Sequence, residues 1–430
     1  MNSKNLSSFK KINYILLSFK IGILLLVSAP AISAIFLIFS SIGGFILQKG
    51  KILKDKFNIF LFFISLLILL VTIYQTFFGE IPYISWTHSL SWIGLFNWIP
   101  LFFCYIGFQP FLNSKDSRRT ISLIFLLGTV PLLISGLLQY FFKIYGPFDA
   151  LNGLVIWYSR PLEPDEGLTG LFNNRNYAGA WLSIITPFSI AYLLEKRDIK
   201  KRIVSLIPLL IILLTTFLTF SRSAWLNSGI SLLLLIGKSS ILFLISVCFL
   251  FFLLSLSCFG NLNILNISSL FDSSIYYRFC SKFSEFGFSN SHRLIIFENA
   301  LKLIKSKPLI GYGASSFATL YFINTGRSTT HTHNILMDLA INYGLPVSIL
   351  IGSFVIKLII ESFREIYLNK QKLFSFFDKA WWASCFIMMI SHLYDNTYYD
   401  LRISISCWVL LAGLRNIIRT KKNNLLIFYK

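Results

Sequence analysis

Apolar runs, each long enough to cross a bilayer, follow one another almost from one end of this chain to the other. A helix needs about 20 apolar residues to span the hydrocarbon core. The chain is 55% hydrophobic and only 13% charged, which is unusual for a soluble domain. Because the runs are continuous rather than alternating, they favour helices over the strands of a membrane barrel. We therefore predict an all-α polytopic membrane protein.

About twelve transmembrane helices are expected, separated by proline, glycine and charged residues. Their predicted bounds are 13–28, 32–48, 57–78, 90–111, 120–142, 174–194, 203–220, 222–236, 240–258, 334–356, 380–394 and 401–417. Residues 1–258 would hold the first nine helices, with an outer loop at 143–173. Residues 259–333 would form a large extracytoplasmic loop between helices nine and ten, and residues 334–430 the last three helices and a tail. No cleavable signal peptide is expected.

The basic residues predict the orientation. Most of the 39 lysines and arginines lie in connections that share one side of the predicted topology. The short connections on the other side, GEIPYISWTHS and YDNTYYD, hold none. This positive-inside pattern places both termini in the cytoplasm. It explains the net charge of +21 through topology and contact with membrane lipids, so no nucleic-acid partner is expected.

The six cysteines are scattered along the chain, mostly inside apolar runs. They show neither the spacing of a disulfide framework nor that of a zinc site. We interpret them as small buried residues.

Within the long loop, the segment 291–306 is expected to form an amphipathic helix that begins at Ser291 and places Arg293 in its first turn. Its predicted apolar stripe is Leu294, Phe297, Leu301 and Ile304. Such a helix can lie along the membrane surface or pack on a small core of the loop itself. The sequence leaves both arrangements open.

Two further cations are expected at the outer ends of helices. Arg222, in FSRSAW, occupies the very short connection between the seventh and eighth predicted spans. Arg175 and Asn176, in TGLFNNRNYAGAWL, precede a helix that opens with small residues. Ionisable residues at membrane level are functional candidates. The alternatives are that Arg222 contacts lipid phosphate and that the asparagines only cap the helix.

A histidine pair stands before the tenth predicted span, in THTHNILMDLAINYG. His331 and His333 lack further ligands at zinc spacing, so we expect no metal and no cofactor. A histidine at the membrane boundary is well suited to proton transfer, and capping by His333 and Asn334 is the alternative. Arginine matches phosphate oxygens and stays charged. Several arginines and a histidine at headgroup level therefore fit a reaction of a lipid-linked diphosphate.

These segments together resemble the O-antigen ligase and polymerase superfamily of bacterial membrane glycosyltransferases, the WaaL/Wzy-like proteins. TGLFNNRNYAGAWL is similar to the family's TG-x-F-x-x-x-N segment, with Asn176 at the matching asparagine and Arg175 where many members have proline. FSRSAW matches at Arg222, and HRLIIFENALKLIKSKPLIGYGASSF matches at Arg293. HTHNILMDLAINYGLPVSIL matches at His333 and Asn334.

The resemblance implies an inverting, metal-independent glycosyltransferase with a GT-C-like fold in the bacterial inner membrane. Its donor would be a glycan on undecaprenyl diphosphate, and its acceptor the lipid A core of lipopolysaccharide or another glycan. The matching arginines would bind the diphosphate, joined here by Arg175, and His333 would activate the acceptor. Asn176, Asn334 and His331 would support them. A polysaccharide polymerase of the same superfamily and a transporter, of the proposed inorganic-carbon type, remain alternatives.

Overall fold

The computed structural model describes residues 3–79, 87–163, 166–237, 245–246, 249, 292–369 and 374–427. The first half of the chain forms α1 (Ser3–Leu25), α2 (Pro30–Leu47), η1 (Ile52–Lys54), α3 (Lys56–Phe78), α4 (His88–Gly94), η2 (Leu95–Asn97), α5 (Ile99–Phe108), η3 (Gln109–Leu112), α6 (Lys115–Phe142), β1 (Phe148–Ala150), β2 (Val155–Trp157), α7 (Arg175–Glu195), α8 (Ile199–Leu218) and α9 (Arg222–Ile236). The second half forms α12 (His292–Ser306), α13 (Ser316–Thr325), α14 (Ile335–Tyr343), α15 (Leu345–Phe363), η7 (Arg364–Leu368), α16 (Phe376–Tyr394) and α17 (Leu401–Ile427).

The prediction of an all-α membrane protein is confirmed. Within the described residues, eight helices are long and apolar enough to cross a membrane, and Ile12–Leu25 and Arg222–Ile236 are shorter apolar helices. The predicted span 380–394 forms α16, which falls outside this set of eight and is buried within the bundle. The predicted ninth span, 240–258, lies almost wholly outside the described residues, as does the loop up to residue 291.

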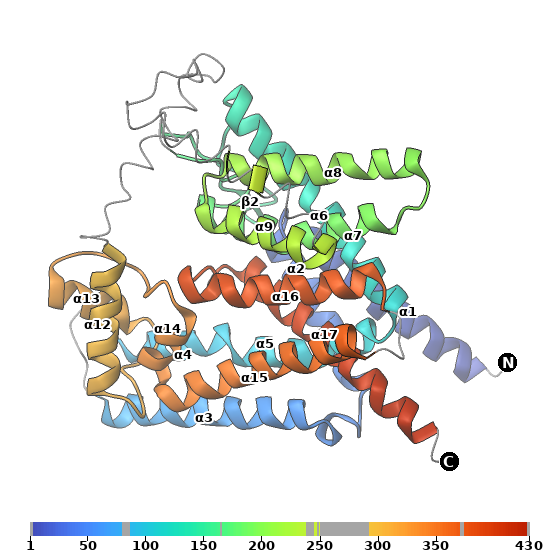
Figure 1. Cartoon of the computed structure of the whole chain (residues 1–430). Helices are drawn as coiled ribbons and strands as arrows, with labels where there is room; N and C mark the ends of the chain where they lie inside the picture. Colours follow the sequence, from blue (N-terminus) through green and yellow to red (C-terminus); the bar gives the residue numbers. More distant parts are fainter. Residues whose placement is uncertain are drawn as a thin grey trace, which may run out of the picture.

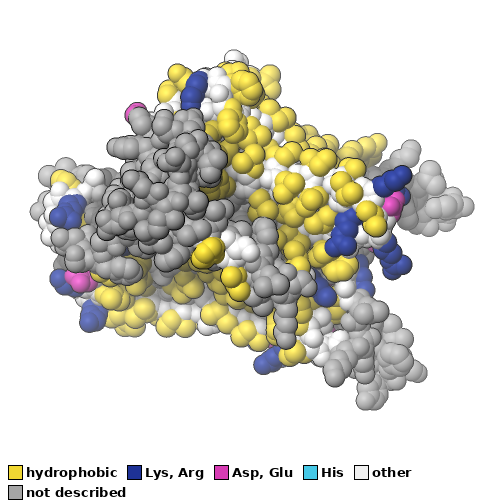
Figure 2. Space-filling model, turned by 45° about the horizontal axis from the view of Figure 1, so that its top comes forward, with side chains coloured by type: hydrophobic (Ala, Val, Ile, Leu, Met, Phe, Trp, Pro, Cys, Tyr) yellow, Lys and Arg dark blue, Asp and Glu magenta, His cyan; other side chains and the backbone are white. Residues whose placement is uncertain are grey.

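Most of the long helices run side by side, and α12 stands across their ends (Figure 1). Both chain termini lie at one end of this bundle, which we call the terminal end. The opposite end, where α12, α13 and α14 lie, is called the loop end. Figure 2 shows hydrophobic side chains over much of the visible surface and basic side chains gathered toward the two ends. This is the surface expected of a bundle that crosses a bilayer.

The tenth predicted span, 334–356, is wrong as a single helix. The structure divides it into α14 and α15 at Gly344, whose φ is 88°. A Cβ at this position would stand 2.1 Å from the carbonyl oxygen of Leu309, so only glycine permits this close approach. Pro346 follows in the first turn of α15, where proline fits, whereas it does not fit the interior of a helix. The break leaves the N-terminus of α14 at the loop end.

The predicted apolar stripe of α12 is only partly correct. The helix packs through Ile296, Ala300, Leu303 and Ile304 against α13 and α14, whereas Leu294 and Leu301 are about half exposed. The helix therefore packs on a small core of the loop region, which is one of the two arrangements left open by the sequence.

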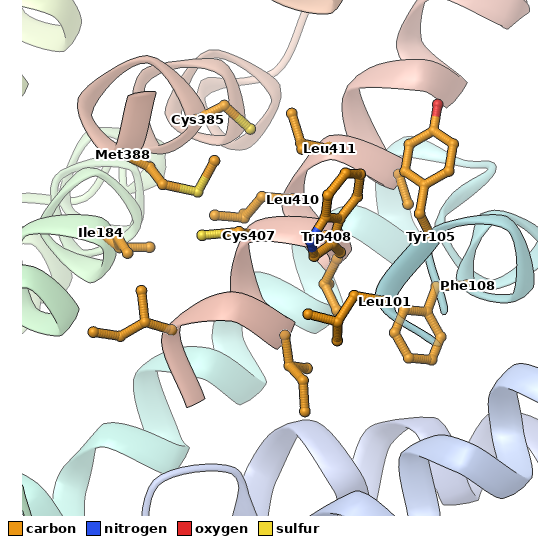
Figure 3. Close-up of a cluster of buried hydrophobic side chains, with 14 of the residues drawn as sticks. Leu101, Tyr105, Phe108, Ile184, Cys385, Met388, Cys407, Trp408, Leu410 and Leu411 are labelled. Atoms are coloured by element: carbon orange, nitrogen blue, oxygen red, sulfur yellow. The ribbon is translucent and has the colours of Figure 1, made fainter. Parts of the chain in front are cut away.

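The main core lies where α5, α7, α16 and α17 meet (Figure 3). Tyr105 from α5, Ile184 from α7, Met388 from α16 and Trp408 from α17 are among its buried side chains. The cysteines described as free in the structure, Cys104, Cys385 and Cys407, lie within these helices. Cys385 and Cys407 are buried and Cys104 is half-buried, which agrees with the interpretation of these cysteines as packing residues.

Candidate active site

The segment before α14 places the two predicted histidines side by side. His333 has a left-handed backbone with φ of 59°, an uncommon conformation for a residue other than glycine or asparagine. Its ring centroid lies 4.5 Å from that of His331. The next residue, Asn334, caps α14 by accepting from the backbone N–H groups of Leu336 and Met337. Its amide also donates to the carbonyl of Leu393 at 2.8 Å, which joins α14 to the end of α16.

Asp395 is the partner of His333. Its Oδ1 lies 3.4 Å from Nδ1 of His333. The carboxylate is nearly buried, whereas 24% of the His333 side chain is exposed. This geometry favours a proton on Nδ1 that donates to Asp395 and leaves Nε2 as the acceptor. Asp395 is not among the residues predicted from the sequence. Its pairing with a residue 62 positions away could not be inferred without the fold.

His331 differs from His333 in its hydrogen-bond partner. Its Nδ1 lies 2.7 Å from the hydroxyl of Thr330. Burial, together with the nearby His333 and Arg293, lowers the pKa of His331 to about 4, although Asp395 opposes this shift. His331 is therefore neutral at neutral pH. It can accept or donate a hydrogen bond, which fits the supporting role predicted for it.

Arg293 reaches the same cluster from α12. Its Nη1 donates to the carbonyl of Tyr394 at 3.2 Å, one residue before Asp395. The positive charge of the guanidinium also lowers the pKa of His331, so Arg293 lies within electrostatic range of this histidine. Across the described parts of the chain, no carboxylate lies within ion-pair distance of Arg293. The predicted residues Arg293, His331 and His333 are thus brought together with Asp395.

A second set of contacts holds the histidine segment to the turn between α16 and α17. The buried carboxylate of Asp338, in α14, accepts from the backbone N–H of Thr332 at 3.0 Å. The same carboxylate accepts from the side-chain amide of Asn396. Since Asn396 directly follows Asp395, one turn fixes both the histidine segment and its carboxylate partner.

Arg175 and Asn176 begin α7 at the loop end. The capping residue is Asn174, whose side chain accepts from the N–H of Asn176 at 2.7 Å. Asn176 itself is the second residue of the helix, so it is not the cap. Tyr177, one residue further on, lies close enough to Asp395 for that charge to act on it. The start of α7 therefore lies near the histidine partner.

Arg222 is the first residue of α9 and is exposed. The α7 and α9 helices touch at their first turns, because a Cβ at Gly179 would lie 2.8 Å from the Cβ of Ala224. From α16, the Tyr394 hydroxyl donates to Asn227 at 2.8 Å, five residues along α9 from Arg222. Within the described residues, the packing of α7, α9 and α16 is what links Arg222 and Arg175 to the histidine cluster.

The turn after α16 also holds the segment before α7. Arg402 is buried, pairs with Asp400, and donates to the carbonyl of Leu171 at 3.0 Å. Its guanidinium carbon lies 3.7 Å from the ring centroid of Phe172. Residues 395–402 therefore contact both the histidine segment and the TGLF segment. These contacts were not predicted. For example, nothing in the sequence around Arg402, YYDLR, indicates that its partner Leu171 lies 231 positions away.

One group of side chains in the described residues can hold a metal ion. His331, His333 and Asp395 each offer a ligand atom, and these atoms lie within 4.8 Å of one another. Three protein ligands plus a water is a common catalytic arrangement for zinc. Against this, the Arg293 guanidinium adds positive charge beside the group. The expectation of a metal-free site stays a prediction.

The resemblance to the O-antigen ligase superfamily is confirmed by comparison with known proteins. A family model described as O-antigen ligase matches residues 207–352, a stretch that contains Arg222, Arg293 and His333. The ComP-specific O-oligosaccharyltransferase of Acinetobacter baylyi (strain ATCC 33305 / BD413 / ADP1) is 26% identical in an alignment over 380 residues, which covers 84% of this chain. The chain spans 62% of the length of that relative.

Proposed function

We propose that this protein is an O-antigen ligase-like membrane glycosyltransferase that moves a glycan from undecaprenyl diphosphate to an acceptor hydroxyl. The observation that carries the proposal is the cluster of His333, Asp395 and Arg293 at the loop end of a membrane-spanning bundle. It combines a candidate base with a cation that has no carboxylate partner among the described residues. The similarity to an O-antigen ligase model and to an oligosaccharyltransferase supports the reaction class.

His333 is the proposed general base. With Nδ1 donating to Asp395, its Nε2 can take the proton of an acceptor hydroxyl as that oxygen attacks the anomeric carbon. The new carbon–oxygen bond forms while the bond from the sugar to the diphosphate breaks. Asp395 stabilises the imidazolium that results and keeps the ring oriented. A single displacement of this kind inverts the anomeric configuration, and it needs no metal or cofactor.

The arginines are proposed to bind the diphosphate. Arg293 lies beside the histidines, while Arg222 and Arg175 begin two helices that touch each other at the same end. The N-termini of α7 and α9 add the positive ends of two helix dipoles. As the sugar leaves, negative charge grows on the diphosphate, and fixed cations stabilise it more in the transition state than in the ground state. Asn174 caps α7 by accepting from the backbone N–H of Asn176, and Asn334 caps α14, the helix that follows His333.

The loop end would face away from the cytoplasm in the bacterial inner membrane, with both termini inside. This orientation follows from the positive-inside pattern of the connections. It gives the site access to a lipid-linked donor at headgroup level and to an acceptor beyond the membrane. The acceptor is proposed to be a hydroxyl of a lipid A core, another glycan, or a protein.

The test is a transfer assay with the purified protein in lipid nanodiscs. The donor is an oligosaccharide on undecaprenyl diphosphate, and separate reactions offer a lipid A core glycan and a hydroxyl-bearing protein. We expect His333→Ala to lower transfer by about 10³-fold, the usual contribution of a general base. His331→Ala is the matched control two residues away, and it should lower transfer by about fivefold or less, since one neutral hydrogen bond contributes about 1 kcal/mol.

Two outcomes would contradict the proposal. One is equal activity of the wild type and His333→Ala when their melting temperatures agree. The other is loss of transfer after treatment with a chelator and recovery with added zinc, which would assign His331, His333 and Asp395 to a metal. Products that carry repeated additions of the donor glycan would identify a polymerase rather than a ligase.

A further inference from the structure

A short hairpin in the first outer loop carries an apolar surface that the site does not use. Strand β1 pairs antiparallel with β2, with Phe148 opposite Trp157 and Ala150 opposite Val155. The connection between them is Leu151-Asn152-Gly153-Leu154. The hairpin follows α6 directly, so it leaves the bundle at the loop end.

The hairpin exposes apolar rather than polar side chains. Leu151 is 64% exposed, and Phe148, Leu154 and Tyr158 are each close to half exposed. Asp149 is the one charged residue between residues 144 and 158. Its carboxylate accepts from the backbone N–H of Gly153 at 2.9 Å, so this charge closes the turn. An exposed turn of this composition is unusual for a protein surface in water.

The backbone of Leu151 has an unfavourable conformation for leucine. Its φ is 55°, in the left-handed region that favours glycine and asparagine. The two residues that follow, Asn152 and Gly153, also have positive φ and suit it. A leucine here adds backbone strain, and its exposed side chain gains little packing within the described parts of the chain to offset it. A contact outside the chain would supply the missing stabilisation.

The hairpin lies next to the ends of α1, α2 and α6. The indole N–H of Trp157 donates to the carbonyl of Ser28, in the turn that joins α1 to α2, at 2.8 Å. Phe141 and Phe142, the last residues of α6, are 55% and 69% exposed. The hairpin thus continues the exposed apolar surface of the spans at the level where they leave the membrane. Tyrosine and tryptophan are enriched at this level, since their rings are apolar and their tips are polar.

We infer that the tip of this hairpin, Leu151 and Leu154, inserts into the boundary between headgroups and acyl chains of the leaflet at the loop end. The partner is the bilayer lipid itself. A charged protein surface would find no complementary charge here, because Asp149 is used within the turn. The inserted tip anchors the connection between α6 and α7, the helix that begins with Arg175. This inference depends on membrane insertion of the bundle and not on the proposed reaction.

The test uses a benzophenone amino acid at position 151 in the full-length protein, reconstituted in vesicles of phosphatidylethanolamine and phosphatidylglycerol. Irradiation followed by mass spectrometry identifies the covalent adduct. We expect a phospholipid adduct at 151, as at Phe39, which is exposed on the lipid-facing side of α2. Ser328, exposed in the polar segment 326–330, should give little or none.

A second variant separates insertion from folding of the turn. Leu151→Asn suits a left-handed backbone, so it should not unfold the hairpin. With the probe moved to position 154, we expect this substitution to lower the lipid adduct several-fold at an unchanged melting temperature. The inference is overturned if position 151 yields only protein adducts, which would indicate a protein partner. It is also overturned if position 151 yields no more lipid adduct than Ser328.

Discussion

Arg118 and Arg415, at the terminal end of the bundle, have different partners from Arg293, at the loop end. At the terminal end, Arg118 pairs with Asp378 at 2.7 Å and Arg415 with Asp55 at 2.8 Å, and all four side chains are buried. At the loop end, Arg293 contacts a backbone carbonyl, and no carboxylate of the described chain pairs with it. An arginine paired inside the protein stabilises the fold, whereas one without an internal counter-charge can bind an anionic ligand. The partner, and not the residue type, therefore separates the structural cations from the candidate catalytic ones.

The largest effect on activity is expected for Arg293→Met. It should lower transfer by about 10³-fold, because it removes a preorganised cation from the developing charge of the diphosphate. The melting temperature should stay within a degree or two of the wild type, since the side chain makes one exposed contact. Steady-state transfer and thermal unfolding in the same detergent measure both. A large loss of stability with activity retained per folded molecule would place Arg293 among the structural arginines.

The opposite result is expected at the terminal end. Arg415→Met leaves the Asp55 carboxylate buried without its cation, which should lower the free energy of unfolding by about 3 kcal/mol. Activity per folded molecule should be unchanged. Arg119→Met is the matched control: its pair with Glu195 is partly exposed, so its loss should cost less than about 1 kcal/mol. Equal melting temperatures for the two variants would contradict the assignment of Arg415.

Asp395→Asn tests whether the carboxylate at the loop end supports the base. The change keeps the shape of the side chain but removes the charge that stabilises protonated His333. Loss of such an orienting partner lowers activity by about 10²-fold. Rates of transfer across pH 6 to 9 give the measurement. Full activity at every pH would show that His333 works without Asp395.

Arg402 offers a finer comparison, because it is a loop-end arginine that does have an internal partner. Arg402→Lys keeps the charge but loses the contacts with Leu171 and Phe172, which lead into α7. We expect the KM for the lipid-linked donor to rise about tenfold through misplacement of Arg175, with the acceptor KM and the pH profile unchanged. A rise confined to the acceptor KM would argue that Arg402 positions something else.

The smallest effect is expected for His331. Its pKa of about 4 in the folded protein lies below the ordinary value of 6.5, so the folded protein resists protonation that the unfolded chain accepts. Stability should therefore fall as pH decreases from about 6.5 to 4. His331→Gln should reduce this slope and change kcat/KM by about fivefold or less, since one neutral hydrogen bond contributes about 1 kcal/mol. Melting temperatures of both proteins from pH 7.5 to 4.5 provide the measurement. Identical slopes would contradict the lowered pKa.

Much of the fold follows from the sequence, because helix length and turn residues are local properties. The runs that become α2, α3, α6, α7 and α8 lie within a few residues of their predicted positions. The break at Gly344 was missed although glycine and proline stand two residues apart there, because the apolar run around them continues. The α12 stripe was misplaced, since a helix with several apolar residues does not reveal which of its sides meets a neighbour.

Only some residues of the candidate site could be predicted from the sequence. Arg293 and His333 stand in recognisable segments, but their proximity depends on helices that are far apart in the chain. Asp395 and Arg402 were not predicted, because each acquires its role from a contact with a residue more than 60 positions away. A short polar turn such as YDNTYYD looks like any connection until the fold shows that it contacts both halves of the site.

We propose that Arg293 and His333 meet at one anion-binding site at the loop end. The most direct measurement is a cryo-EM structure in lipid nanodiscs with undecaprenyl diphosphate bound. We predict the phosphates within hydrogen-bond distance of the Arg293 guanidinium, on the side of the cluster to which Nε2 of His333 points. Phosphates bound among the basic residues of the terminal end, with the loop-end cluster empty, would contradict the account.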